Sequence, residues 1–195
     1  MDRGYRRRVK RVSIVGSTGS GKTRLGRALA SLMSVPFIEL DAINWGPNWT
    51  MIGADRFQGL AAEAIARDAW VIDGNYGGQG IRDLVWARAD TIIWLDYSLP
   101  LVLWRLLRRG VVRIRSREEL WPGTGNRETI RDTFFSRESL FVWAVTSYGK
   151  RRKNYPRLLA LPQYESATKL RFRTPREAEE WLEAQRQGAL SRIHG

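Results

Sequence analysis

The feature that most constrains this chain is a glycine-rich run near its N-terminus. The run follows the spacing G-x-x-x-x-G-K-[ST] and consists of Gly16, Ser17, Thr18, Gly19, Ser20, Gly21, Lys22 and Thr23. Apolar residues 12–15 precede it, and residues 25–33 that follow have their apolar side chains at helical spacing. The pattern therefore predicts a strand, a tight loop and a helix in direct succession.

A loop of this kind is suited to bind phosphate groups. Glycine lets the backbone curl so that successive N–H groups point at phosphate oxygens, and the dipole of the following helix favours negative charge at the same place. Lys22 would reach the β- and γ-phosphates, and the Thr23 hydroxyl would bind Mg²⁺. We therefore expect residues 16–23 to bind ATP together with Mg²⁺.

Composition narrows the chemistry that the chain can perform. The chain has 195 residues, enough for one domain with a full core, and it has no cysteine, which excludes disulfides and thiolate metal sites. Its one histidine, His194, is next to the last residue, so any general base should be a carboxylate. The sequence has neither a secretory segment nor an apolar run near the ~18 residues of a membrane span. We expect a cytoplasmic protein.

The chain is strongly basic, with a formal net charge of +13. One interpretation is affinity for nucleotides or nucleic acid, and the other is a general preference for arginine in the source genome. Residues 1–10 are expected to form a basic tail, which is either solvated or an arm for nucleic acid. The excess charge is concentrated in Arg3, Arg6, Arg7, Arg8, Lys10 and Arg11.

Apolar strands alternate with helical patterns along residues 11–187. This alternation predicts an α/β domain of the P-loop NTPase class, with a five-stranded parallel sheet flanked by helices. The closing helix should begin at Thr174, with Pro175 in its first turn and Glu177 completing a capping box. Residues 188–195 are expected to be a C-terminal tail. The expected strands are residues 12–15, 37–40, 70–72, 91–95 and 169–172.

An arginine-rich segment follows the fourth predicted strand. It begins as a helix near Ser98 and Pro100 and becomes polar and glycine-bearing toward Gly125. We predict a lid over the phosphates at about residues 108–130, in which Arg109 and Arg113 stabilise charge on the transferring group. The alternative is a solvated arginine face on a surface helix.

Two carboxylates stand at the ends of predicted strands, where parallel sheets bind ligands. Asp73 follows the third strand and could hold Mg²⁺ or one of its waters, although an Asp-Gly pair is also typical of turns. Asp41 follows the second strand and could orient or deprotonate an acceptor hydroxyl. Trp45 and Trp49 come next and could stack on a base or sugar or pack in the core.

Several motifs occur in the order found in a known family. The chain resembles the adenylate-kinase-like P-loop proteins often labelled DNA topology modulation proteins, over residues 12–182. The matching segments are residues 16–23, Leu40-Asp41, Trp45-Gly46-Pro47-Asn48-Trp49, Trp70-Val71-Ile72-Asp73-Gly74-Asn75-Tyr76, residues 89–96, Arg105, and Gly125-x-x-Glu128.

The resemblance implies a nucleoside-monophosphate-kinase fold, ATP binding and an arginine-bearing lid. Adenylate kinases have Asp-Gly-Phe-Pro-Arg where this chain has Asp73-Gly74-Asn75-Tyr76-Gly77, so the arginine expected at Gly77 is absent. Arg82 lies five residues further along. This departure weakens the case for AMP as the acceptor. The carboxylate at Asp41 is instead similar to the acid that the small-metabolite kinases for shikimate and gluconate have at this position.

These observations favour a kinase that transfers the γ-phosphate of ATP·Mg²⁺ to a small-molecule or nucleotide acceptor. Its expected catalytic residues are Lys22, Asp41, Asp73, Arg109 and Arg113, with Thr23 and Asp73 at the metal. A second hypothesis is an ATP-responsive nucleic-acid-binding protein that affects DNA topology. A third is a slow ATPase that acts through a protein partner, whose interface could include Phe134, Phe135, Phe141, Trp143 and Val145.

Overall fold

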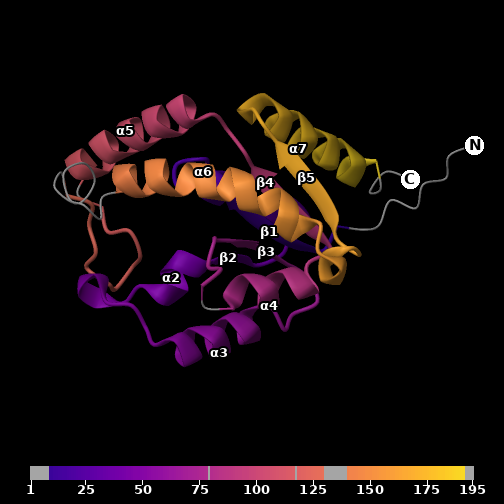
Figure 1. Cartoon of the computed structure of the whole chain (residues 1–195), viewed down its shortest axis with the longest axis horizontal. Helices are drawn as coiled ribbons and strands as arrows, with labels where there is room; N and C mark the ends of the chain where they lie inside the picture. The colour runs from indigo at the N-terminus through magenta and orange to yellow at the C-terminus, as the bar shows by residue number, and fades with distance from the viewer. Residues whose placement is uncertain (1–8, 79, 117, 130–139, 192–195) are drawn as a thin grey trace, which may run out of the picture.

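A computed structural model describes residues 9–78, 80–116, 118–129 and 140–191 of the chain. Its centre is a sheet of five parallel strands in the order β2-β3-β1-β4-β5, which confirms the predicted fold class (Figure 1). The basic cluster from Arg3 to Arg8 and the residues Arg117, Phe134, Phe135 and His194 lie outside the described part. The strands are β1 (Arg11–Gly16), β2 (Phe37–Glu39), β3 (Trp70–Asp73), β4 (Thr91–Leu95) and β5 (Thr168–Phe172).

Helices cover both faces of the sheet. Strand side chains alternate between the two faces: Trp70 and Ile72 belong to one buried cluster, whereas Val71 belongs to the other. This alternation gives the domain two apolar layers, one on each side of a fully covered sheet. The described helices are α1 (Lys22–Met33), α2 (Leu40–Asn44), α3 (Ala54–Ala64), α4 (Ile81–Arg88), α5 (Leu99–Ser116), α6 (Leu140–Leu159) and α7 (Pro175–Leu190).

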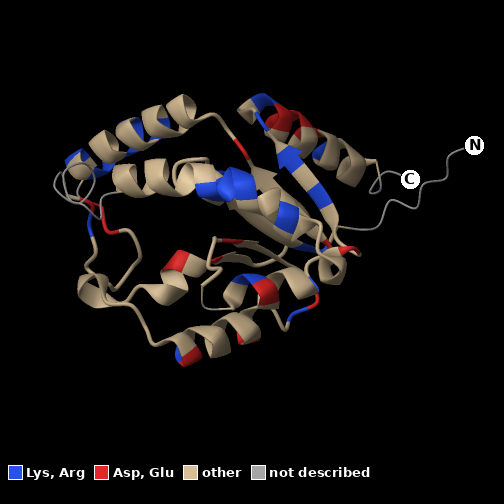
Figure 2. Cartoon of the chain, in the orientation of Figure 1, with Lys and Arg blue, Asp and Glu red and all other residues tan. Residues whose placement is uncertain are grey.

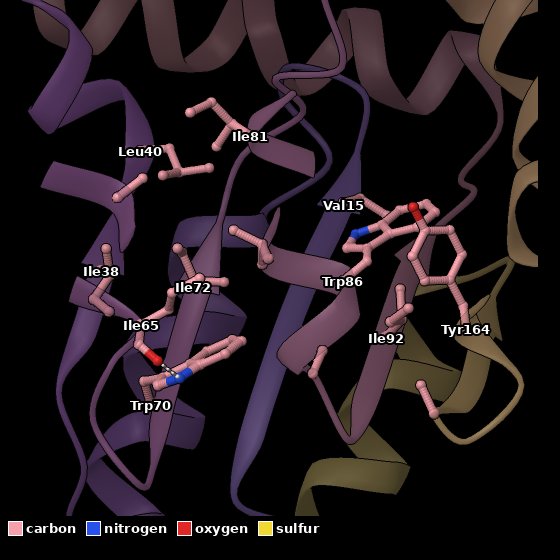
Figure 3. Close-up of a cluster of buried hydrophobic side chains, with 14 of the residues drawn as sticks. Val15, Ile38, Leu40, Ile65, Trp70, Ile72, Ile81, Trp86, Ile92 and Tyr164 are labelled. Atoms are coloured by element: carbon pink, nitrogen blue, oxygen red, sulfur yellow. Dashed lines mark hydrogen bonds between the residues drawn. The ribbon is translucent and has the colours of Figure 1, made fainter. Parts of the chain in front are cut away.

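The first buried cluster packs α3 and α4 against the sheet (Figure 3). Trp70 is fully buried, and its indole N–H donates to the Ile65 carbonyl at 3.2 Å, so this large side chain leaves no unsatisfied polar atom. Trp86 and Tyr164 meet edge to face, with ring centroids 5.3 Å apart. The second cluster packs α1, α5 and α7 on the opposite face of the sheet.

The closing helix begins as the sequence predicts. The Thr174 hydroxyl accepts a hydrogen bond from the Glu177 backbone N–H at 3.3 Å, and the Glu177 carboxylate accepts one from the Arg173 N–H at 2.8 Å. The helix then continues to Leu190. Residues 188–190, predicted to belong to the C-terminal tail, are therefore helical.

Strand β2 is shorter than predicted. It ends at Glu39, so Leu40 begins α2 and Asp41 lies in the first turn of that helix rather than at a strand end. At this point the chain meets the segment after β3, where Gly74 has φ +144° and would place a Cβ only 2.7 Å from the Leu40 side chain. Leu40 packs against this bare backbone, and the close approach requires glycine.

No helix in the described part of the chain is long and apolar enough to cross a membrane.

The packing of α1 on β2 predicts opposite effects for two glycine-to-alanine changes. Gly26→Ala would place a methyl group 2.4 Å from Phe37 Cε2, whereas Gly59 in α3 has open space around the corresponding position. We expect Gly59→Ala to raise the free energy of unfolding by about 0.5–1 kcal/mol through helix propensity. Gly26→Ala should lower it by about 1–3 kcal/mol through overpacking.

Chemical denaturation of the two variants measures both changes. Replacing Phe37 by leucine in the Gly26→Ala background should recover part of the loss, because the clash involves the aromatic ring. Equal stabilisation by both alanines would contradict the contact between α1 and β2.

Candidate functional site

The glycine-rich loop runs from the end of β1 into the first turn of α1. A Cβ at Gly16 would lie 2.7 Å from the Leu95 carbonyl oxygen and 2.9 Å from Ser20 Oγ, so only glycine fits at this bend. Gly21 has φ +93° and leads directly into α1. The loop is closed by the Ser20 N–H, which donates to the Ser17 carbonyl at 3.0 Å. The strand, loop and helix are therefore in the predicted order.

Asn75 holds the start of the loop in place. Its side-chain oxygen accepts from the Gly16 N–H at 3.1 Å, and its amide nitrogen donates to the Gly16 carbonyl at 2.6 Å. Tyr155 from α6 donates its hydroxyl hydrogen to the same Asn75 oxygen at 3.0 Å. Asn75 therefore links the loop, β3 and α6.

Thr23 and Asp73 meet beside the loop. The Thr23 hydroxyl donates to Asp73 Oδ2 at 2.8 Å, and Asp73 is 2% exposed. Burial raises the pKa of Asp73 to about 6, although the Lys22 ammonium and the Thr23 hydrogen bond act in the opposite direction. The two predicted metal residues are thus brought together.

These groups suit a hard divalent cation that keeps most of its waters. Thr23 and Asp73 offer oxygen donors, and the nearby Ser20 hydroxyl is buried without a hydrogen-bond partner in the described structure. No group of three or more acidic or histidine side chains forms a ready-made metal cage among the described residues. Mg²⁺, which binds through one or two protein ligands plus phosphates, fits this donor set.

Lys22 is close enough to Asp73 and Asp41 for the charges of both predicted carboxylates to act on it. Its ammonium donates to the Ser17 carbonyl at 3.2 Å. Burial lowers the pKa of Lys22, while the charges of Asp73 and Asp41 act to raise it. Lys22 and Thr18 also line a cavity of about 810 Å³ that extends from the loop toward α2 and α6.

The arginines of α5 differ in what they contact. Arg105 donates to the Ser20 carbonyl of the loop at 3.1 Å. Arg109 and Arg113 instead converge on Glu128 Oε1, at 3.3 and 2.7 Å. The positive charges of Arg109 and Arg113 are therefore partly neutralised by the Glu128 carboxylate, whose side chain is 5% exposed. Their ion-pair partner is thus Glu128 and not the phosphate loop.

Arg109 is nonetheless close enough to the site for its charge to act on Lys22. The predicted lid, residues 108–130, begins as the last two turns of α5 and continues through the described loop 118–129.

That loop is tied to the segment after α2. Asn126 accepts from the Trp49 N–H at 3.0 Å and donates to the Gly46 carbonyl at 2.9 Å. Trp49 meets both Trp45 and Trp121 edge to face, with centroids 5.8 and 5.9 Å apart. Trp45 lines the cavity, while the Trp49 ring packs between its two neighbours.

The α2 side of the cavity carries the second predicted carboxylate. Asp41 accepts a short hydrogen bond from the Tyr76 hydroxyl, which fixes the orientation of the carboxylate. Burial and the Asp41 charge both raise the Tyr76 pKa, so the phenol remains a donor. Asn44, 1% exposed, donates to the same hydroxyl at 3.4 Å. Asp41, Asn44 and Tyr76 all line the cavity.

The site also contains residues that the sequence prediction did not assign to it. The sequence does contain a signal for Arg105, because Arg105, Arg109 and Arg113 recur every four residues and so share one face of the helix. Arg82 lies beside Gly77, where its guanidinium nitrogen is 2.9 Å from the Cβ that another residue would have there. Nothing local in the sequence indicates Asn75 or Tyr155, because each acts on a distant segment.

No family model matches the chain. Among curated proteins it is similar to the ATP-dependent protease ATPase subunit HslU of Oleidesulfovibrio alaskensis, 34% identical over 94 residues, which is 47% of this chain. The same subunit of Campylobacter jejuni is 39% identical over 59 residues, 30% of this chain. The matches span only 19% and 12% of those proteins, so they concern a segment and not the whole ATPase.

Solved structures match nearly the whole chain. Shikimate kinase from Acinetobacter baumannii, in complex with shikimate, has a TM-score of 0.57 and 20% identity over 95% of both chains. A gluconokinase from Sinorhizobium meliloti 1021 has a TM-score of 0.51 and 18% identity, covering 96% of this chain and 95% of its own. At these identities the likeness concerns the fold: the chain has the five-stranded α/β fold of P-loop kinases.

Proposed function

We propose that this protein transfers the γ-phosphate of ATP to a hydroxyl group of a small molecule, with Mg²⁺. The observation that carries the proposal is one cavity bounded by both halves of such a reaction. Lys22 of the phosphate loop and Asp41, which is oriented by Tyr76, both line this cavity. The volume of about 810 Å³ is in the range of small-molecule sites.

The donor side is supported by the loop and its neighbours. Backbone N–H groups of the loop other than those of Gly16 and Ser20, together with the N-terminus of α1, would bind the phosphates, and Lys22 would reach the β- and γ-groups. Thr23 and Asp73 would hold Mg²⁺, which when bound offsets the phosphate charge. The segmental similarity to an ATPase subunit and the P-loop kinase fold agree with ATP as the donor.

On the acceptor side, Asp41 would accept the proton of the attacking hydroxyl. The acceptor oxygen forms a bond to the γ-phosphorus as the bond from that phosphorus to the β–γ bridging oxygen breaks, and ADP leaves. Tyr76 donates to Asp41 and so keeps a carboxylate oxygen turned toward the cavity. Arg109, held by Glu128 near Lys22, would balance charge on the transferring group, and Arg113 would support it.

The nucleic-acid alternative rests on the net charge of +13 and on a basic tail that lies mostly outside the described residues. The cavity favours the kinase, because it joins the phosphate loop to a carboxylate with no need for a polymer. The lid boundaries at residues 108–130 and the cytoplasmic location belong to the same proposal.

Lys22→Ala tests the donor site. The substitution removes the ammonium at the end of the loop, and we expect affinity for ATP·Mg²⁺ to fall by at least about tenfold, as for a buried charge pair. Calorimetric titration measures the change. Lys153→Ala removes the same charge from an exposed position on α6 and should leave affinity unchanged. Absence of ATP binding to the folded wild-type protein would refute the proposed donor.

The raised pKa of Asp73 predicts how the affinity for ATP·Mg²⁺ depends on pH. Because the Asp73 pKa is about 6 and only the carboxylate holds a cation, affinity should fall about fourfold between pH 7.5 and 5.5 from this group alone. The γ-phosphate titrates in the same range. Asp73→Asn retains only that ligand contribution, so the difference between the wild-type and variant pH profiles isolates Asp73.

The raised pKa of Asp73 has the opposite effect on the stability of the nucleotide-free protein, which should fall as the pH rises. A carboxyl pKa raised by folding favours the folded state at low pH, and this contribution is lost as pH rises through about 6. Asp73→Asn should therefore raise the melting temperature at pH 7.5 while it weakens ATP·Mg²⁺ binding. A variant that binds as wild type would remove Asp73 from the metal site.

Asp41→Asn separates chemistry from nucleotide binding. The amide cannot accept the acceptor proton, so we expect kcat to fall by about 10²–10⁴ while affinity for ATP changes little. Acceptor-dependent ADP release, measured over a panel of hydroxylated metabolites and nucleoside monophosphates, gives kcat. Asp55→Asn, on the exposed surface of α3, is the charge-matched control. Equal kcat in the two variants would exclude Asp41 as the base.

A further inference from the structure

The middle of α6 carries a run of four basic residues, Lys150 to Lys153, of which Lys150 and Arg151 line the cavity. Figure 2 shows this basic run as a blue stretch in the middle of α6. Arg151 and Arg152, although adjacent, have different environments. Arg152 anchors the helix through an ion pair with Asp96, whereas Arg151 lines the cavity.

Arg152 fixes α6 on the sheet. Its Nε lies 3.0 Å from Asp96 Oδ1, and Arg171 of β5 binds the other oxygen of the same carboxylate. Asp96 is 5% exposed, so both of its oxygens are satisfied by these two arginines away from bulk water. Together with the Tyr155–Asn75 hydrogen bond, this pairing sets the rotation of α6 about its axis.

Arg151 lines the cavity, and no carboxylate of the described residues forms an ion pair with it. Its Nη1 is inaccessible to solvent and has no hydrogen-bond partner in the described structure. The guanidinium lies over the Trp143 ring, 5.8 Å from the centroid, and its charge acts on Lys22, which lines the same cavity. A buried donor that is left unpaired costs free energy, and such groups are usually satisfied by a ligand or water.

The other cations of the cavity are differently placed. Arg82 is already paired with Asp83 at 2.9 Å and lies over Trp86. Lys150 is exposed, so its charge is largely screened by solvent. Lys22 is assigned to the phosphates of the donor, so Arg151 is the cation in the described part of the cavity lining that is best placed to bind an anion of the acceptor.

The part of the cavity lining formed by α2 contains a hydrogen-bond acceptor that a ligand hydroxyl could satisfy. Asn44 is 1% exposed, and its side-chain oxygen is buried without a hydrogen-bond partner in the part of the chain described. Asp41 stands beside it in the same cavity lining. A ligand with hydroxyls at this wall would satisfy Asn44 and present one oxygen to Asp41.

We propose that the acceptor is a small molecule with an anionic group bound by Arg151 and a hydroxyl at Asp41 and Asn44. This inference rests on the proposed phosphotransfer but concerns the acceptor alone. A carboxylate and a phosphate have the same chemistry toward a guanidinium, which binds either through paired N–H groups. The anion at Arg151 and the hydroxyl at Asp41 would orient the acceptor along the cavity.

Calorimetric binding to the full-length protein tests the proposal with matched probes. The carboxylate arm compares gluconate with glucose, and the phosphate arms compare glycerol 3-phosphate with glycerol and AMP with adenosine. Each pair is measured with and without Mg²⁺ and a non-hydrolysable ATP analogue. We expect at least one anionic probe to bind about tenfold more tightly than its neutral partner, as for a charge-assisted contact.

Arg151→Gln should reduce that preference to within about threefold, and Arg151→Lys should keep part of it because the charge remains. Arg157→Gln, an exposed position on the same helix, is the matched control and should retain the full preference. Thermal unfolding verifies that each variant is folded. The arm in which the preference is found identifies the anion as carboxylate or phosphate.

Two results would overturn the inference: no preference for an anion in any wild-type pair, or a preference that Arg151→Gln leaves intact. Failure of the proposed function has a different signature, since the ATP analogue itself would then not bind. Probe preferences measured without nucleotide remain interpretable in that case.

Discussion

The candidate site depends on the position of β1 between β3 and β4 in the sheet. This order brings Asp73, the last residue of β3, to the edge where the phosphate loop leaves β1, within hydrogen-bond distance of Thr23. It also places the Leu95 carbonyl against Gly16, so the loop must bend with glycine at that point. An exchange of neighbouring strands would separate the carboxylate from the loop.

The parts of the molecule that are governed by local pattern could be predicted from the sequence. The phosphate loop is contiguous, and its glycines, Lys22 and Thr23 have fixed positions relative to one another. The Thr174 cap depends on residues three apart. The five strands are short apolar segments in a helix–strand alternation that permits few topologies, so the parallel sheet followed from them.

The parts that could not be predicted are contacts between distant segments. Asn75 binds Gly16 across 59 residues, and nothing near Asn75 indicates that partner. Arg109 and Arg113 form ion pairs with Glu128, and the arginine pattern of α5 alone does not indicate this partner. The predicted end of β2 was one residue too late, and the close contact between Leu40 and Gly74 depends on how two distant segments pack in three dimensions.

The hydrogen bonds of Asn126 have a consequence for how ligands enter and leave. The loop 118–129 and the segment of Gly46 and Trp49 share two hydrogen bonds and a row of tryptophan rings. Neither segment can move away from the other without breaking both hydrogen bonds and separating the tryptophan rings. Because Trp45 lines the cavity and Trp49 packs against it, any widening of the cavity at Trp45 involves the loop 118–129 as well, and its free-energy cost includes the loss of these contacts.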